Sequence, residues 1–313
     1  MTSLIEQAAQ RLEQLRRAGA ELPGDMPTTV RARPIVNDVE PPTLVPEPAP
    51  MVSKSVELDL QALAAMGIVT PNSPRSRMAD QFRVIKRPLL SNVRGKGATK
   101  TAHSNLIMVT SALAGEGKSF TSINLAMSIA AELDHTVMLV DADVARPSIP
   151  GTLKLPLGPG LLDVLQGQAD LPSVLLRTNL PKLSVLTSGT PHPKATELLA
   201  SEAMRNLLDE MSRRYADRII VFDSPPLLLT TEARVLATHM GQIVVVVQAD
   251  RTLQADVKHA LSTIESCPVR MMVLNKARVD AESKYATGYG YGYGYGYGSD
   301  KAHGHDKAQP QSA

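Results

Sequence analysis

Short, uninterrupted apolar runs alternate with segments of helical periodicity from residue 105 onward. The runs have the length of strands buried on both faces, whereas the segments between them repeat apolar residues every three or four positions. This alternation is typical of an α/β domain in which helices flank a mostly parallel sheet. The expected strands are Leu106 to Val109, Val137 to Val140, Ile219 to Phe222, Ile243 to Val247 and Met271 to Leu274.

Two amphipathic patterns precede this region. Met1 to Ala20 is predicted to form a helix whose apolar stripe docks either on the protein's own body or on a partner, and both alternatives stay open. Eight prolines between residues 21 and 50 then favour an extended linker. Met78 to Leu90 repeats the helical pattern and predicts a second helix.

The periodicity ends after Ala281, and Gly288 to Gly298 is an alternating Gly-Tyr repeat. A segment of this composition cannot bury a core and is predicted to be disordered. The chain is therefore expected to divide into an N-terminal helix (1–20), a proline-rich disordered linker (21–55), a helical segment (56–100), an α/β core (101–280) and a tyrosine-rich tail (281–313).

Composition narrows the range of functions. The chain has 313 residues, which suffices for one well-buried domain with extensions. Its formal net charge of +2 is of mixed sign, so no nucleic-acid partner is expected, and the basic stretch Arg94 to Lys100 has the composition of a solvated linker. Cys267 is the only cysteine, and no apolar run approaches the roughly 20 residues that span a bilayer. These features predict a cytoplasmic protein.

The strongest local signal is the segment from Ser111 to Ser119, which follows an expected strand and precedes a helical pattern. This is the context of a P-loop, although Ala112 replaces the first glycine of G-x-x-x-x-G-K-[ST]. Gly115 and Gly117 permit the tight turn in which successive N–H groups face phosphate oxygens. Lys118 would reach the β- and γ-phosphates and Ser119 would bind Mg²⁺, so ATP and Mg²⁺ are the expected cofactors of a P-loop NTPase fold.

Two further expected strands end in acidic residues. Asp141 and Asp143 follow the run that begins at Val137, and Asp223 follows the run that begins at Ile219. Ligands of open α/β sheets gather where such strands end. A carboxylate at that place can hold Mg²⁺ through water or accept a proton.

The order of A-G-E-G-K-S, D-A-D-V-A-R-P and D-S-P-P, followed by a tyrosine cluster, resembles the bacterial tyrosine kinases of capsule and exopolysaccharide systems with their Walker A, A′ and B motifs. The resemblance implies a catalytic set comprising Lys118, Asp141, Asp143 and Asp223, with Asp141 as the base. It implies metal ligation by Ser119, Asp143 and Asp223. The implied nucleotide contacts are Ala114, Gly115, Glu116, Gly117, Lys118, Ser119, Phe120, Arg146 and Asn275. Ala114 and Ala145 depart from the family, which has proline and arginine there.

The same resemblance implies partners and substrates. Asp80, Arg83 and Lys86 are similar to a family pattern that mediates contacts between subunits of a ring, which would make residues 56–100 an oligomerisation segment. A membrane-embedded chain-length determinant, or polysaccharide co-polymerase, would be the activator that recruits the protein to the inner face of the cell membrane, and a tyrosine phosphatase would reverse its action. The chain resembles the separated form of these kinases, including those linked to exosortase loci. The implied phosphoacceptors are Tyr285, Tyr289, Tyr291, Tyr293, Tyr295 and Tyr297.

Two other functions share these motifs. A ParA- or MinD-like ATPase switch would have the same fold, but such proteins carry a signature lysine where this chain has Leu113. An ATP-binding scaffold without catalysis would use the Gly-Tyr repeat for association. Tyr215, which directly precedes a buried strand, is expected to pack and to stay unmodified.

Overall fold

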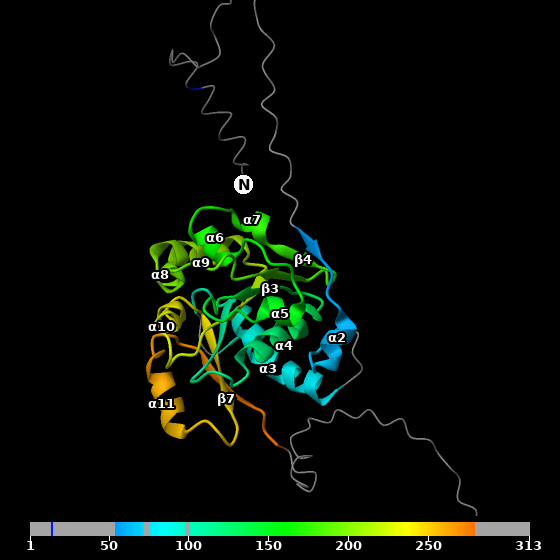
Figure 1. Ribbon diagram of the computed structural model, residues 1–313, viewed down its shortest axis with the longest axis vertical. Helices are drawn as coiled ribbons and strands as arrows, with labels where there is room; N and C mark the ends of the chain where they lie inside the picture. Colours follow the sequence, from blue (N-terminus) through cyan, green and yellow to red (C-terminus); the bar gives the residue numbers. More distant parts are fainter. Residues whose placement is uncertain (1–13, 15–53, 72–75, 98–100, 279–313) are drawn as a thin grey trace, which may run out of the picture. The chain divides into compact units, whose positions relative to one another are not determined.

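The computed structural model describes residue 14 and residues 54–71, 76–97 and 101–278. Within these ranges one eight-stranded sheet has the order β1-β4-β5-β3-β6-β2-β7-β8, and every neighbouring pair is parallel except β4 and β5 (Figure 1). The strands are β1 (Ser55–Val56), β2 (Leu106–Ser111), β3 (Thr136–Asp141), β4 (Leu176–Thr178), β5 (Leu183–Leu186), β6 (Arg218–Asp223), β7 (Gln242–Gln248) and β8 (Arg270–Asn275). A mostly parallel sheet was predicted, and it is confirmed.

The five strands expected from the sequence are present, each longer by two residues than expected. The three additional strands, β1, β4 and β5, have two to four residues each and no uninterrupted apolar run long enough to indicate them. β4 and β5 form the antiparallel pair, and β1 joins β4 at the sheet edge. β1 begins at Ser55, the last residue of the range assigned to the linker.

The central strands alternate their side chains between two apolar cores. In β2, Leu106 and Met108 face one core while Ile107 and Val109 face the other, and β3, β6 and β7 repeat this alternation. Helices α6 to α11 contribute to the first core and α2 to α5 to the second, so the sheet is covered on both faces, as Figure 1 shows.

The helices cover the sheet in two groups. On the second core lie α2 (Leu60–Ala65), α3 (Arg77–Val93), α4 (Lys118–Ala130) and α5 (Ile149–Leu153). On the first core lie α6 (Leu161–Leu165), α7 (Leu171–Val174), α8 (Ala195–Leu199), α9 (Glu202–Arg214), α10 (Glu232–Ala237) and α11 (Gln254–Ser262).

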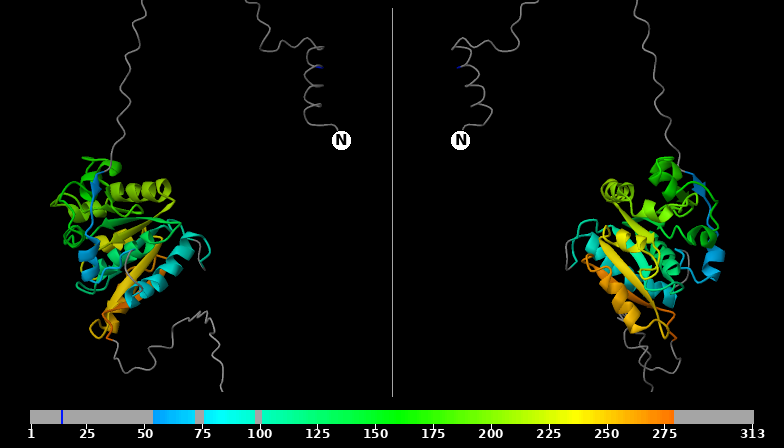
Figure 2. Two further views of the ribbon diagram at one scale, coloured as in Figure 1. Left: turned by 90° about the vertical axis from the view of Figure 1, so that its right-hand side faces the viewer. Right: turned by 60° about the vertical axis from the view of Figure 1, so that its left-hand side comes forward.

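Helix α3 confirms the second amphipathic pattern and runs beside the end strands β7 and β8 (Figure 2). Its Lys86 side chain is only 4% exposed. The ammonium group donates a hydrogen bond to the Ser128 carbonyl at 2.5 Å and lies 2.6 Å from the Glu132 carboxylate, at the end of α4. Lys86 therefore fastens α3 to α4 within one chain, which leaves little of its surface for the expected subunit contact. Asp80 and Arg83 are exposed on the same helix and pair with each other.

Several expectations lie outside the described residues. These are the N-terminal helix apart from residue 14, most of the linker and the tyrosine-rich tail. In the part of the chain that the structure describes, no helix combines the length and apolar character needed to cross a membrane.

We predict that Lys86→Met lowers the free energy of unfolding by about 1 to 3 kcal/mol, because the methionine retains the apolar stem but removes a charge-assisted hydrogen bond to a buried carbonyl. The neighbouring Arg87→Met is the matched control, since Arg87 is exposed. Urea denaturation of both variants measures the difference. Equal losses in the two variants would show that the Lys86 pair does not stabilise the fold.

Candidate nucleotide site

The P-loop connects β2 to α4, and two glycines give it its shape. Gly117 has φ +100° and precedes the first residue of α4, while Gly115 has φ +83°. A Cβ on Gly117 would lie 2.0 Å from Asn275 Nδ2, so no other residue fits there without displacing that amide. The loop thereby brings its N–H groups and the N-terminus of α4 to one place, which is the arrangement that binds phosphate.

Glu116 holds the loop from inside. Its side chain is 2% exposed and accepts hydrogen bonds from Leu113 N at 2.7 Å, from the Thr252 hydroxyl and from Gln248 N at 3.4 Å. The acidic residue of the motif is thus a support for the loop and its carboxylate is turned away from bound phosphate. Sequence reasoning included Glu116 among nucleotide contacts and missed Thr252, because the two residues lie 136 positions apart.

Strand β8 supports the same loop from its outer side. Asn275 Nδ2 donates to the Glu116 carbonyl at 2.9 Å, and Lys276 Nζ donates to the Gly115 carbonyl at 2.7 Å. Lys276 adopts φ +57°, and its N–H donates to Asn275 Oδ1 at 2.9 Å. Asn275, expected on the adenine side, therefore contacts the P-loop backbone directly.

The register of the sheet explains why two of the aspartates meet. Asp141 of β3 and Asp223 of β6 are direct partners in neighbouring strands, and both are 0% exposed. The pKa of Asp141 is raised to about 8, mainly by burial and next by the charge of the neighbouring Asp223. Burial likewise raises the pKa of Asp223, while the Lys118 ammonium opposes that rise. Asp141 Oδ2 accepts a hydrogen bond from Ile149 N at 3.1 Å, and Asp223 Oδ1 accepts one from Ser122 Oγ at 3.0 Å.

Asp143 has a different environment because it lies beyond the strand end. Its Oδ2 is 2.5 Å from Lys118 Nζ, and its Oδ1 accepts from Arg146 N at 3.3 Å. Lys118 Nζ also lies 3.4 Å from Ser119 Oγ. The second A′ aspartate thus positions the P-loop lysine, and phosphate oxygens would compete with it for that ammonium.

A pocket of about 380 Å³ opens in front of these residues. Six of the predicted site residues line it: Ala114, Gly115, Lys118, Ser119, Asp143 and Arg146. Phe120 and Asn275 instead line a neighbouring groove between α3 and β8, where Phe120 packs against the second core. Asp141 and Asp223 lie behind the pocket rather than on its wall.

The site fits Mg²⁺ if phosphates and water complete its shell. Asp141 Oδ1 and Asp223 Oδ2 are buried without a hydrogen-bond partner among the described residues, and Ser119 offers a hydroxyl in front of them. No group of three acidic, histidine or cysteine side chains in the described ranges converges as a complete metal cage. Mg²⁺ commonly binds through one or two carboxylates together with substrate phosphates, which matches this donor set.

Asp141, the expected base, lies behind the pocket wall. Burial raises its pKa, and a Mg²⁺ ion bound beside it would lower that pKa again. Asp143 is the aspartate that reaches the pocket wall. The two A′ aspartates therefore differ in position: Asp143 faces the pocket and Lys118, whereas Asp141 is buried beside Asp223.

Comparison with known families supports the interpretation of these motifs. Residues 102–283 match the family model described as ParA, NUBPL iron-transfer P-loop NTPase. The tyrosine-protein kinase YwqD of Bacillus subtilis is 30% identical over 220 residues, which cover 70% of this chain and 89% of that protein. The tyrosine-protein kinase ptk of Acinetobacter johnsonii is 34% identical over 174 residues, 56% of this chain, but the match spans only 23% of the longer relative.

Solved structures agree with the sequence relatives. The chimerical protein CapA2B2 superposes with a TM-score of 0.59 at 26% identity, covering 73% of this chain and 95% of the chimera. The overall fold is therefore shared with a protein whose sequence differs at most positions.

We predict that Asp141→Asn changes the pH dependence of stability in metal-free solution. The folded pKa of about 8 exceeds the unfolded value near 4, so the wild-type fold loses stability as pH rises between them. Asparagine retains the acceptor for Ile149 N and has no proton to lose. Urea denaturation in EDTA should show the stability of the variant relative to wild type rising by at least about 1 kcal/mol from pH 5 to pH 8. The exposed Asp217→Asn is the control, and parallel curves for Asp141→Asn and wild type would contradict the assignment.

Proposed function

Because the chain belongs to the bacterial tyrosine kinases, which share the ParA-type P-loop fold, we propose that it transfers the γ-phosphoryl group of ATP to tyrosine hydroxyls, including those of its own tail. The observation that carries the proposal is the pocket in which Lys118, Ser119 and Asp143 meet at the carboxyl ends of the parallel strands. Regulation of exopolysaccharide synthesis or export is the process we assign to it, by the resemblance to kinases of such systems.

The residues of the pocket divide the work of phosphoryl transfer. The P-loop N–H groups and Lys118 hold the β- and γ-phosphates, and Arg146 adds a second cation at the pocket wall. Mg²⁺, when bound beside Ser119 and Asp223, neutralises phosphate charge. As the phenolic oxygen bonds to the γ-phosphorus and the bond to the β,γ-bridging oxygen breaks, Asp143 accepts the phenolic proton and ADP leaves.

Leu113 separates this proposal from an ATPase switch. Partitioning ATPases use a lysine at this position to reach a partner's nucleotide, whereas Leu113 is partly buried against the first core. It has neither the charge nor the freedom to reach across a dimer. This position therefore speaks against the ATPase switch.

The phosphoacceptors we propose lie in the tail. Glycines at alternate positions allow an extended tyrosine to enter a pocket at modest steric cost. Tyr215 differs, because its ring packs against the first core with the guanidinium groups of Arg214 and Arg218 5.9 and 4.9 Å from the ring centroid. The proposed acceptors are Tyr285, Tyr289, Tyr291, Tyr293, Tyr295 and Tyr297.

We further propose that the tail is phosphorylated in trans within a homo-oligomer. Asp80 and Arg83 remain exposed on α3 and are available for a subunit contact, whereas Lys86 is not. A membrane-embedded polysaccharide co-polymerase as activator and recruiter to the inner membrane face, together with a cognate tyrosine phosphatase, completes the proposed system. These partners rest on the resemblance to capsule kinases.

We predict that Lys118→Met reduces phosphotyrosine formation from labelled ATP and Mg²⁺ by at least about 100-fold, because Lys118 contacts the transferred phosphates. Lys258→Met, an exposed lysine on α11, is the matched control. Circular dichroism should show both variants folded. Undiminished labelling of Lys118→Met would exclude the P-loop pocket as the active site.

A second prediction concerns acceptors and the trans reaction. Phenylalanine at all six tail positions should remove almost all labelling while ATP affinity is unchanged, because only the hydroxyls are lost. When this variant, which retains its active site, is mixed with Lys118→Met, which retains its tail, label should appear on the Lys118→Met chain. Mass spectrometry that finds phosphate chiefly on Tyr215 or on serines would refute the tail assignment, and no label in the mixture would refute transfer in trans.

A further inference from the structure

A second pocket, of about 560 Å³, lies at the opposite edge of the sheet from the P-loop. It is lined where β3, β5 and β6 begin, at Thr136, Leu183 and Arg218, and where the antiparallel β4 ends, at Thr178. The nucleotide site uses the carboxyl ends of β2, β3 and β6, so the two pockets share strands but no lining residue. This second pocket is called the basal pocket below.

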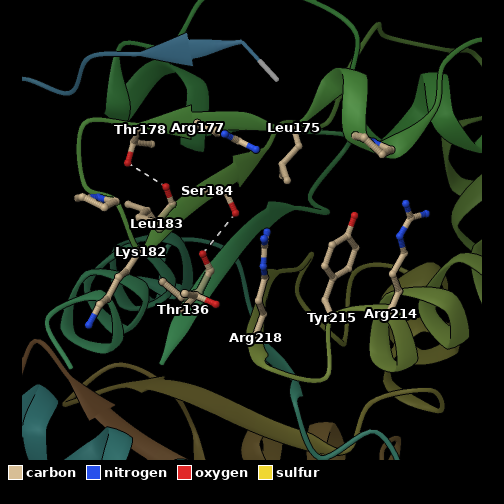
Figure 3. Close-up of a pocket in the computed structure, with 13 residues that line it drawn as sticks. Thr136, Leu175, Arg177, Thr178, Lys182, Leu183, Ser184, Arg214, Tyr215 and Arg218 are labelled. Carbon is tan, nitrogen blue, oxygen red and sulfur yellow. Dashed lines mark hydrogen bonds between the residues drawn. The ribbon is translucent and has the colours of Figure 1, made fainter. Parts of the chain in front are cut away.

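The basal pocket is cationic. Figure 3 shows Arg214, Tyr215 and Arg218 rising side by side toward β4, which contributes Arg177. Within the described residues, Arg177 and Arg218 have no carboxylate at ion-pair distance, and Arg214 pairs with the exposed Glu210. No acidic side chain lines the pocket. Three guanidinium groups with a single carboxylate partner create a local excess of positive charge that favours an anion.

Polar atoms in the basal pocket also await a partner. Thr136 Oγ1 and Arg218 Nε are buried without a hydrogen bond among the described residues. Two other hydroxyls are already hydrogen-bonded: Thr178 donates to the Leu183 carbonyl at 2.9 Å, and Ser184 donates to the Val137 carbonyl at 3.4 Å. An unpaired buried N–H costs free energy, and an anionic oxygen satisfies it best.

The shape of the pocket indicates more than a simple anion. Its volume lies in the range of pockets that enclose organic ligands, and Pro172, Leu175 and Leu183 give it an apolar wall. The planar guanidinium group of an arginine can bind two phosphate oxygens at once, while the apolar wall suits an aromatic ring.

We propose that the basal pocket binds a phosphotyrosine side chain carried by the tail of this chain. The proposal rests on the proposed function, because it is the product of that reaction that would occupy the pocket. A phosphotyrosine combines a near-dianionic phosphate with an aromatic ring, and the tail glycines leave room for arginines on either side of it. The pocket would hold a phosphorylated tail away from the nucleotide site. The number of phosphates on the tail would then affect how the subunits assemble.

Binding can be measured without any kinase activity. The probe is a synthetic peptide with the sequence of residues 288–298, phosphorylated on Tyr293, and the protein is the full chain after phosphatase treatment. A non-hydrolysable ATP analogue with Mg²⁺ is present in excess, so that the P-loop is filled. Fluorescence anisotropy should show binding of the phosphopeptide at least about tenfold tighter than that of the unphosphorylated peptide.

Variants locate the binding site. Arg177→Gln combined with Arg214→Gln should weaken phosphopeptide binding at least about tenfold, because each arginine makes charge-assisted hydrogen bonds. Arg213→Gln, on the same helix turn but outside the pocket, should bind as wild type does. Equal binding by wild type and the double variant would overturn the proposal, and so would equal binding of the two peptides. Competition by inorganic phosphate at the same concentration as the phosphopeptide would reveal a simple anion site and would also overturn it.

The source of the tail is distinguished with autophosphorylated full chain. If each chain binds its own tail, the tail should block binding of the labelled peptide at every protein concentration. If the tail comes from another copy, dilution should free the pocket for the peptide. A pocket left open at all concentrations overturns the proposal. If the chain fails to label in the kinase assay but binds the synthetic phosphopeptide, the proposed function fails while the basal pocket is retained.

Discussion

A buried pair of like charges controls the chemistry of this protein. The register between β3 and β6 places Asp141 and Asp223 directly opposite each other, and both are excluded from solvent. Two carboxylates in that position cannot both ionise at low cost unless cations lie nearby. Lys118 is close enough to oppose the rise in the pKa of Asp223, and a metal ion would act in the same sense on both groups. The P-loop lysine and Mg²⁺ both supply positive charge that offsets this electrostatic cost.

The loop that delivers Lys118 is held from outside the motif. Glu116 accepts hydrogen bonds from the segment after β7, and Asn275 and Lys276 of the β8 end bond to loop carbonyls. The peptide groups of the loop are thereby fixed before phosphate arrives, which is the preorganisation that electrostatic catalysis requires. Since β8 is the last strand of the sheet and α3 packs beside it, a contact on that edge would act on the loop through only a few residues.

The two ends of the parallel strands present opposite charges. Acidic side chains gather at the carboxyl ends, where the cations of the loop balance them, whereas arginines gather at the amino ends around Tyr215. One sheet can therefore carry a site that makes a phosphate ester and a pocket suited to hold one.

The sequence by itself determined the central strands, the P-loop and the positions of the three aspartates. Continuous apolar runs indicate strands buried on both faces, and the two loop glycines allow the positive φ that the phosphate turn requires. β4 and β5 could not be predicted in this way, because three or four residues show no period. Lys86 fell on a charged helix face, and periodicity cannot tell a solvated lysine from one that pairs with the next helix.

Only the tertiary structure decided which of the predicted residues reach the pocket and which are buried behind it. Burial, which depends on what packs over a strand end, raises the pKa of Asp141 and separates it from the pocket-lining Asp143, although the two residues are only two positions apart. The Glu116 and Thr252 contact and the arginines of the basal pocket come from segments far apart along the chain. Local sequence patterns indicate which chemical groups are present and which backbone conformation each segment favours. Desolvation and the meeting of distant side chains arise from the packed chain, and these set the charge that each group carries.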